Sequence, residues 1–285
     1  MHILRSGRAT ATVDPLDGGR LKSLIVDQNE LLGSEEVQPG NPRGWYYGSF
    51  RMAPYVGRIK NGRFRFDGVQ YVIPPNAGPH AGHGLAFDVP WSTIHSESHT
   101  TLRLATDFDA RWPFGGRVEQ EFVLTESELT LTMTTCNDDR PMPASIGFHP
   151  WFLRDIGTGG LATYSFSPAV RFAPAEDGFP RIPSTDLGKR PWDDVFTQLA
   201  EPPTISWPNG PTLRITSDCN TWIVYEQLPL AFCIESVTAP PDTLGTPLAA
   251  VVTPGNPLVL RMEIAWQRAE SLTPPSSQPA RITTP

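Results

Sequence analysis

Two of the six histidines lie three positions apart in a segment that looks too flexible to form a regular element. His80 and His83 belong to "NAGPHAGHGLAFD" (76–88), which has three glycines and no helical spacing of apolar residues, so we predict a loop. An imidazole titrates at about pH 6.5, so it can transfer protons or bind a metal at physiological pH. The segment alone leaves three readings open: a metal site, a catalytic acid or base beside a bystander, or two solvated histidines.

A third histidine and a glutamate stand among apolar residues. His149 lies in "SIGFHPWFL" (145–153), where Pro150 favours an extended backbone, so we expect the imidazole to project from the end of a strand. Glu235 lies in "AFCIESVTAPPD" (231–242), where desolvation raises the pKa of a carboxyl towards the value that a general base needs. Each residue alone is also compatible with a structural role, as a core histidine or as a glutamate at a strand end facing solvent.

An arginine precedes a turn that contains a lysine, an asparagine and a glycine. Arg58 lies in "PYVGRIKNGRFRFDG" (54–68), and we predict a turn over residues 60–62 followed by a strand over residues 63–66. Taken alone, Arg58 is most simply a surface arginine.

The elements that must position these residues are strands. The 31 prolines and 24 glycines break the chain into short pieces, and between them apolar residues alternate with polar ones, as in "LVLRMEIAW" (258–266), "ELTLTMTTC" (128–136) and "TLRLATDF" (101–108). Such alternation indicates half-buried antiparallel strands, and no window carries a helical apolar stripe. About fifteen strands without a repeated motif predict an all-β fold, a large antiparallel β-sandwich, and not a propeller.

Composition and charge narrow the classes of protein. The net charge of −7 and pI of about 5.4 give no basic surface for nucleic acid, and no apolar run is long enough to span a membrane. Three scattered cysteines fit neither a disulfide framework nor a zinc site, and the first residues lack a secretory leader, so we expect a cytoplasmic protein. We predict one domain over residues 1–267 and a flexible Pro/Ser/Thr-rich tail over 268–285.

Taken in order, these segments look like one family. The series "GRIKNGRFRFDG", "PHAGHG", "FDVPW", "GFHPWF", "WDDVFT" and "FCIESVTAPPD" resembles the aldose 1-epimerase (galactose mutarotase-like) family from about Gly7 to Trp266. The resemblance implies the large β-sandwich of that family, the galactose mutarotase-like supersandwich. It also implies an isomerase that interconverts the α and β anomers of an aldose without a cofactor or a metal.

The resemblance also implies roles for six residues. Three would be catalytic, with Glu235 as the general base, His149 as the general acid that protonates the ring oxygen, and His83 as a hydrogen-bonding partner near C1. Three would bind the sugar hydroxyls: Arg58, Asp193 and Asn76. Asp194 competes with Asp193 for the same position in the alignment. The chain departs from the best-known branch at Gly57, where Asn is usual, and at Gly82, where Leu is usual.

Three alternatives remain open. A hexose-phosphate 1-epimerase would need cations for the phosphate, and the candidates are Arg51, Lys60, Arg63 and Arg111. A carbohydrate-binding module without activity would share the fold, and a metal site would draw on His80, His83, His95 and His99. For partners, we expect a small-molecule sugar, neither nucleic acid nor membrane, and a monomer or homodimer.

Overall fold

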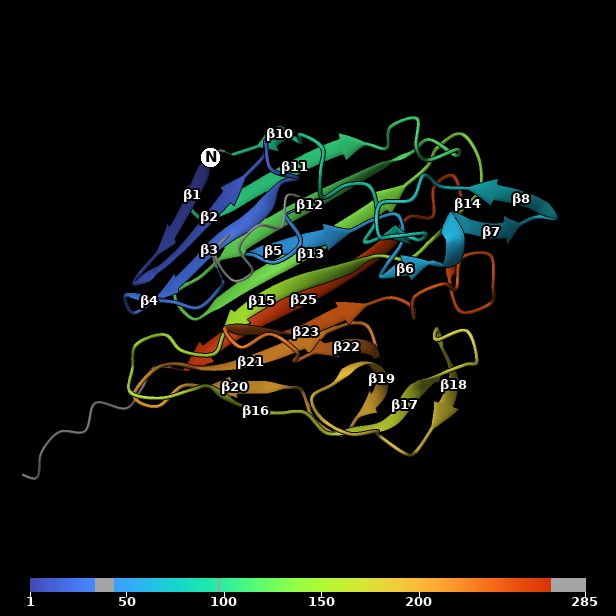
Figure 1. Ribbon diagram of the computed structural model, residues 1–285. Coiled ribbons are helices and arrows are strands. Elements are labelled where there is room, and N and C mark those ends of the chain that lie inside the picture. Colours follow the sequence, from blue (N-terminus) through green and yellow to red (C-terminus); the bar gives the residue numbers. More distant parts are fainter. Residues whose placement is uncertain (34–43, 97, 268–285) are drawn as a thin grey trace, which may run out of the picture.

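The computed structural model describes residues 1–33, 44–96 and 98–267 (Figure 1). Within these ranges the chain is built from strands, and the one helical element is a single 3₁₀ turn at Lys60–Gly62. No described helix has the length and apolar character to cross a lipid bilayer. The tail predicted over 268–285 lies outside the described residues.

The larger sheet holds eleven antiparallel strands, and the site lies on its central part. Its order runs β1 (His2–Ser6), β2 (Ala9–Asp14), β3 (Arg20–Val26), β5 (Ser49–Met52), β15 (Gly147–Leu153), β23 (Ala231–Val237), β22 (Thr221–Tyr225), β19 (Asp193–Leu199), β17 (Pro168–Pro174), β18 (Pro180–Ser184), with β4 (Asn29–Glu30) paired to β3. Strands far apart in the sequence are therefore neighbours at its centre, which no local pattern specifies.

The second sheet holds eight antiparallel strands. Its order is β10 (Ser92–His95), β11 (Thr101–Asp107), β12 (Arg117–Leu124), β13 (Glu128–Cys136), β25 (Leu258–Gln267), β21 (Thr212–Ser217), β20 (Thr204–Ser206), β16 (Thr163–Ser165). Three two-stranded ribbons complete the fold: β6 (Arg58–Ile59) with β9 (Ala81–Gly82), β7 (Arg63–Phe66) with β8 (Val69–Val72), and β14 (Met142–Ala144) with β24 (Ala250–Val252). The predicted all-β sandwich is confirmed.

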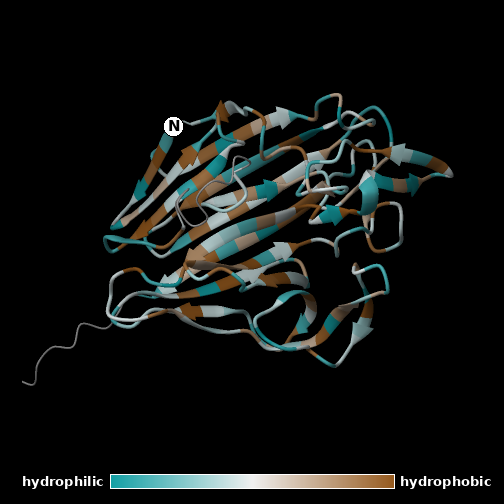
Figure 2. Cartoon of the chain, viewed as in Figure 1, coloured by the Kyte–Doolittle hydropathy of each residue, from teal (hydrophilic) through white to brown (hydrophobic). Residues whose placement is uncertain are grey.

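The core forms where the alternating strands turn their apolar faces to one another. Along β25, Leu260, Met262 and Ile264 are fully buried while Arg261 is exposed, as the alternation predicts. Figure 2 shows hydrophobic and hydrophilic residues alternating along the strands. One continuous cluster of buried residues draws on both large sheets, for example Leu24 of β3 with the three β25 residues. Each such side chain contributes ~1.5–3 kcal/mol on burial, so the alternation fixes which face of each strand points inward.

The expected strand-end position of His149 is wrong, because the residue lies in the middle of β15. Strands β15 and β23 pair at Gly147 and Val237 and again from Trp151 and Cys233 onward. The interruption between these pairs contains Pro150, whose ring nitrogen has no hydrogen to donate to a ladder. The proline is therefore accommodated inside a central strand, and the strand continues past it.

Candidate active site

The register of the central strands arranges the site in two rows across one face of the larger sheet. In the first row, Phe50 of β5 pairs with His149 of β15, and Glu235 of β23 pairs with Ile223 of β22. In the second row, Trp151 pairs with Cys233, Cys233 with Tyr225, and Tyr225 with Asp193 of β19. Because side chains two residues apart share a face, both rows point to the same side of the sheet.

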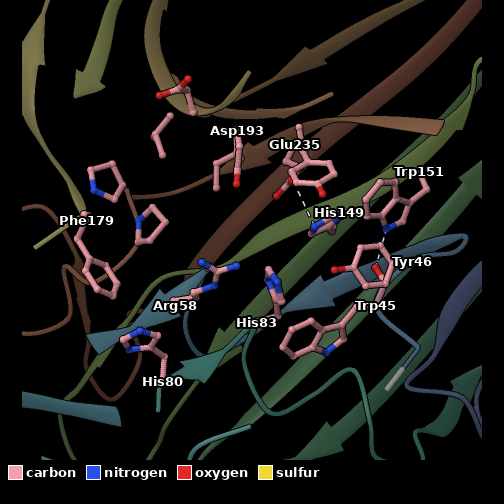
Figure 3. A pocket seen from close by; sticks show the side chains of 18 of the residues that line it. Trp45, Tyr46, Arg58, His80, His83, His149, Trp151, Phe179, Asp193 and Glu235 are labelled. Atoms are coloured by element: carbon pink, nitrogen blue, oxygen red, sulfur yellow. Dashed lines mark hydrogen bonds and ion pairs between the residues drawn. The ribbon is translucent and has the colours of Figure 1, made fainter. Parts of the chain in front are cut away.

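A pocket of about 320 Å³ opens over these rows (Figure 3). Five of the six predicted site residues line it, and they come from three strands of the sheet and from the β6–β9 ribbon with the loop that follows it: Arg58, His83, His149, Asp193 and Glu235. His80 also lines the pocket. Asn76 does not belong to the wall.

His149 and Glu235 form a contacting pair at the base of the pocket. Their side chains are almost fully buried, and His149 Nε2 lies 3.3 Å from Glu235 Oε1. Burial, reinforced by the charge of Asp193, raises the pKa of Glu235 well above its usual value. Burial, with His83 adding to the effect, lowers the pKa of His149 well below its usual value. Burial thus disfavours each charged form alone, and the pair is suited to hold one proton between its two members.

His83 occupies a loop conformation that few side chains adopt. Its φ of 59° is in the left-handed region, and its backbone N–H donates to the Gly57 carbonyl at 2.6 Å. The ring lies edge-on to Trp45, with centroids 4.7 Å apart, and Nδ1 lies 3.4 Å from Met52 Sδ. Desolvation, with the nearby Arg58 cation as the second cause, lowers the pKa of His83 to about 3. The imidazole is therefore neutral at physiological pH.

The neighbouring His80 has a different environment. Its Nδ1 accepts a hydrogen bond from the Asn61 backbone N–H at 3.0 Å, and its ring lies edge-on to Phe179 at the pocket wall. Only one group of side chains in the described parts of the chain has the spacing for a metal ion, and it contains neither loop histidine. The geometry therefore gives no support to a metal site built on His80 and His83.

The structure distinguishes the two adjacent aspartates. Asp194 forms an ion pair with Arg171 at 3.2 Å, while Asp193 has no such partner among the described residues and lines the pocket near Arg58. Desolvation by the pocket raises the pKa of Asp193, Arg58 opposes this change, and Asp194 adds to it. Asp193 is thus the carboxylate with free hydrogen-bonding capacity, and Arg58 is a cation without an ion pair in the described chain.

Asn76 is occupied within its own loop. Its side-chain amide donates to the Gly82 carbonyl at 3.1 Å, and its side-chain oxygen accepts from the Gly82 N–H at 2.6 Å. These two bonds tie the loop to β9 and occupy the side-chain oxygen and nitrogen of Asn76. Asn76 consequently supports the loop that carries His83.

The two departures from the family pattern have local compensations. A Cβ on Gly57, where φ is 54°, would approach Pro241 Cγ to 2.5 Å, and a Cβ on Gly82 would approach the Trp45 ring to 3.2 Å. Pro241 and Trp45 both line the pocket, so they occupy the space that larger residues would need.

The cations considered for a phosphate are not available in the pocket. Arg51 is 1% exposed and donates to the Gly18 carbonyl, and Lys60 is paired with Asp177 at 2.9 Å. Arg111 is paired with two aspartates, and Arg63 lies on the exposed face of β7. None of the four lines the pocket, whose charged side chains are Arg58 and the acids Asp177, Asp193, Asp194 and Glu235. The four candidate phosphate cations therefore do not form a phosphate site in this pocket.

Sequence reasoning missed one wall of the pocket. The hairpin between β17 and β18 contributes Asp177 and Phe179, and Lys60 and Arg181 hold Asp177 by ion pairs. No motif marks this hairpin, because its place over the pocket depends on long-range strand order. Tyr46 and Tyr225 also line the pocket, and only the strand register reveals the latter.

The comparisons with known proteins agree with this geometry. The sequence pattern of the aldose 1-epimerase family matches residues 3–158, so this chain belongs to the aldose 1-epimerase family. The uncharacterized protein YphB of Escherichia coli K12 is 28% identical over 153 residues, and the match spans 50% of this chain and 52% of that protein.

Solved structures share the fold over nearly the whole chain. A protein of Escherichia coli K12, provisionally described as an aldose 1-epimerase, superposes with a TM-score of 0.79 at 18% identity, covering 94% of this chain and 98% of the other. The galactose 1-epimerase of Lactobacillus acidophilus NCFM superposes with a TM-score of 0.74 at 14% identity, covering 92% of each chain. At these identities the superpositions establish the fold.

Proposed function

We propose that this protein is an aldose 1-epimerase acting on an uncharged aldose, with Glu235 and His149 as its acid–base pair. The observation that carries the proposal is the buried contact of 3.3 Å between these two side chains at the base of a pocket suited to a sugar. Family membership supports the reaction class, and the position of Arg51, Lys60, Arg63 and Arg111 outside the pocket wall supports an unphosphorylated substrate.

Interconversion of anomers requires the sugar ring to open and close. Glu235 takes the proton of the C1 hydroxyl while His149 gives a proton to the ring oxygen, and the C1–ring oxygen bond breaks to leave the open aldehyde. Rotation about C1–C2 presents the other face of the carbonyl, and the reverse proton transfers close the ring. Each positioned acid or base contributes ~10²–10⁴-fold to such a reaction.

The burial of the pair favours the open sugar. Before opening, the pair is a carboxylate and an imidazolium, and after opening it is a carboxylic acid and a neutral imidazole. Because the protein around both groups disfavours the charged forms, it lowers the free energy of the state that follows proton transfer. Hydroxyl groups of the bound sugar would supply the hydrogen bonds that stabilise the charged state before the reaction.

The other pocket residues would hold the sugar in place. The thioether of Met52 can only accept from His83 Nδ1, so the proton of the neutral ring belongs on Nδ1 and Nε2 is free to accept from a hydroxyl near C1. Arg58 and Asp193 would bind ring hydroxyls through charge-assisted hydrogen bonds. The aromatic rings in the wall, including Trp45, would pack on the apolar face of the sugar.

The test is the anomerisation of a panel of free and phosphorylated aldoses, followed by polarimetry or exchange NMR. We expect the protein to accelerate the equilibration of at least one free aldohexose and to act poorly on its 6-phosphate. Glu235→Gln keeps the shape of the side chain but removes the base, so kcat should fall by ~10²-fold or more with little change in sugar binding. A wild-type protein that binds sugars without accelerating equilibration would identify a carbohydrate-binding module, and a Glu235→Gln variant with most of its activity would refute the mechanism.

A further inference from the structure

A buried thiol contacts the ring nitrogen of His149 that does not contact Glu235. Cys233 is two residues before Glu235 on β23, so both side chains point to the same face of the strand. The thiol is fully buried, and its Sγ lies 3.4 Å from His149 Nδ1. The imidazole therefore contacts two groups, the carboxyl at Nε2 and the sulfur at Nδ1.

This arrangement differs from a metal site. The ligand atoms of His149, Cys233 and Glu235 lie within 4.8 Å of one another, and zinc accepts all three types of ligand. A single ion would need the sulfur and the carboxylate oxygen to approach the same ring nitrogen, whereas here each contacts a different nitrogen. Burial, reinforced by the charge of Glu235, also raises the pKa of the Cys233 thiol well above its usual value, which disfavours the thiolate that a metal requires.

The two protonation states of the proposed reaction share one feature. When Glu235 is a carboxylate and His149 an imidazolium, both ring nitrogens carry hydrogen. When Glu235 is protonated and donates to Nε2, the single ring proton belongs on Nδ1. In both states Nδ1 carries a hydrogen that the sulfur, 3.4 Å away, can accept, and the proton that moves belongs to Nε2.

We propose that Cys233 is a positioning residue, whose sulfur accepts the Nδ1–H of His149 and so confines proton transfer to Nε2. The part of this proposal that concerns proton transfer to the sugar rests on the proposed function. Sulfur is a weak acceptor, so it orients the ring without stabilising the imidazolium as strongly as a carboxylate would. The ring thus stays acidic enough to protonate a sugar oxygen. The other charged or titratable groups that act on His149 are Glu235, His83 and Arg20.

The kinetic test compares Cys233→Ala with Cys233→Ser, and Cys219→Ala serves as a control because that cysteine is also free and lies away from the pocket. We expect Cys233→Ala to lower kcat by ~10-fold with KM nearly unchanged, which is the scale of losing a partner that orients a functional histidine. Cys233→Ser restores an acceptor, so it should recover most of kcat. Because oxygen accepts more strongly than sulfur, the pH profile of kcat should also move to higher pH.

If Cys233 served only in packing, the kcat values of the serine and alanine variants would rank differently. A buried serine in an apolar site destabilises the fold at least as much as an alanine, so kcat would then follow the melting temperatures of the variants. Wild-type kcat and pH profile in Cys233→Ala, or a loss that merely parallels stability, would overturn the proposal.

A second measurement needs neither a variant nor activity. ¹⁵N NMR of the histidine rings in the wild-type protein reports which nitrogen of His149 is protonated, and we expect Nδ1 to carry hydrogen at neutral pH. A deprotonated Nδ1 would refute the positioning role even in an active enzyme. If the wild-type protein shows no epimerase activity, the proposed function fails, and the NMR result still decides whether the sulfur holds the Nδ1 proton.

Discussion

The low pKa of His83 predicts a specific dependence of stability on pH. A histidine in the unfolded chain titrates at about 6.5, whereas the folded environment lowers the pKa of His83 to about 3. Below pH ~6.5 the unfolded chain therefore takes up a proton at this position that the folded protein does not bind. The contribution of the neutral ring to stability is complete above pH ~6.5 and is lost as the pH falls towards 3.

The size of the effect follows from the same two values. The full difference corresponds to ~5 kcal/mol, because each tenfold change in proton affinity is worth ~1.4 kcal/mol. Water reaches part of the half-buried ring and screens some of this penalty. When the pH falls from 7.5 to 4.5, we therefore expect His83 alone to lower the free energy of unfolding by ~2 kcal/mol. A domain is commonly stable by only ~5–15 kcal/mol, so this loss is measurable.

The assay is urea unfolding of wild type and His83→Asn at pH 7.5 and pH 4.5. Asparagine tolerates the left-handed backbone of this position and does not titrate, so the variant should lose ~2 kcal/mol less than wild type between the two pH values. His80→Asn is the matched control, because it removes the other histidine of the same loop. His149 has its pKa lowered as well and keeps part of the acid dependence in every variant. Equal losses for wild type and His83→Asn would refute the reasoning.

Three further predictions concern the same loop and its surroundings. His83→Ala should lower kcat for anomerisation ~10-fold or more, whereas His80→Ala at the rim should change it by less than about threefold; large and equal losses would place the wrong histidine beside C1. Gly57→Ala places a Cβ 2.5 Å from Pro241 Cγ on a left-handed backbone and should cost ~1–3 kcal/mol of stability, measured by urea unfolding. Adding Pro241→Ala should restore part of that loss in the double variant, whereas Pro241→Ala alone should not stabilise the protein. Dialysis against a chelator should leave the anomerisation rate unchanged, and activity that disappears and returns with zinc would contradict a metal-free mechanism.

Local sequence patterns were sufficient to predict several strands, one turn and part of the chemistry of the site. The alternation over 128–136 and 258–266 predicted β13 and β25, and the turn at 60–62 leads into β7 as expected. Each of these features depends on residues a few positions apart, where periodicity and turn preference act directly. The apolar surroundings of Glu235 likewise predicted a raised pKa for its carboxyl before any contact was known.

Features that depend on distant partners were beyond these patterns. The side chain of Asn76 binds the Gly82 backbone, which only the closed loop brings within reach. The choice between Asp193 and Asp194 depends on Arg171, which lies on the neighbouring strand β17. The pocket wall at Phe179 likewise depends on the order of strands at the sheet edge.

The register of the central strands joins the stability of the fold to the proposed chemistry. On β15 and β23, the residues between the site residues face the opposite way, and Phe148, Phe232 and Ile234 are buried in the core between the two large sheets. A slip of one residue would turn His149 and Glu235 into that core and move apolar side chains into the pocket. Each buried aromatic or aliphatic side chain opposes such a slip with ~1.5–3 kcal/mol. Phe148, Phe232 and Ile234 therefore hold His149 and Glu235 on the pocket face, although none of these three lines the pocket.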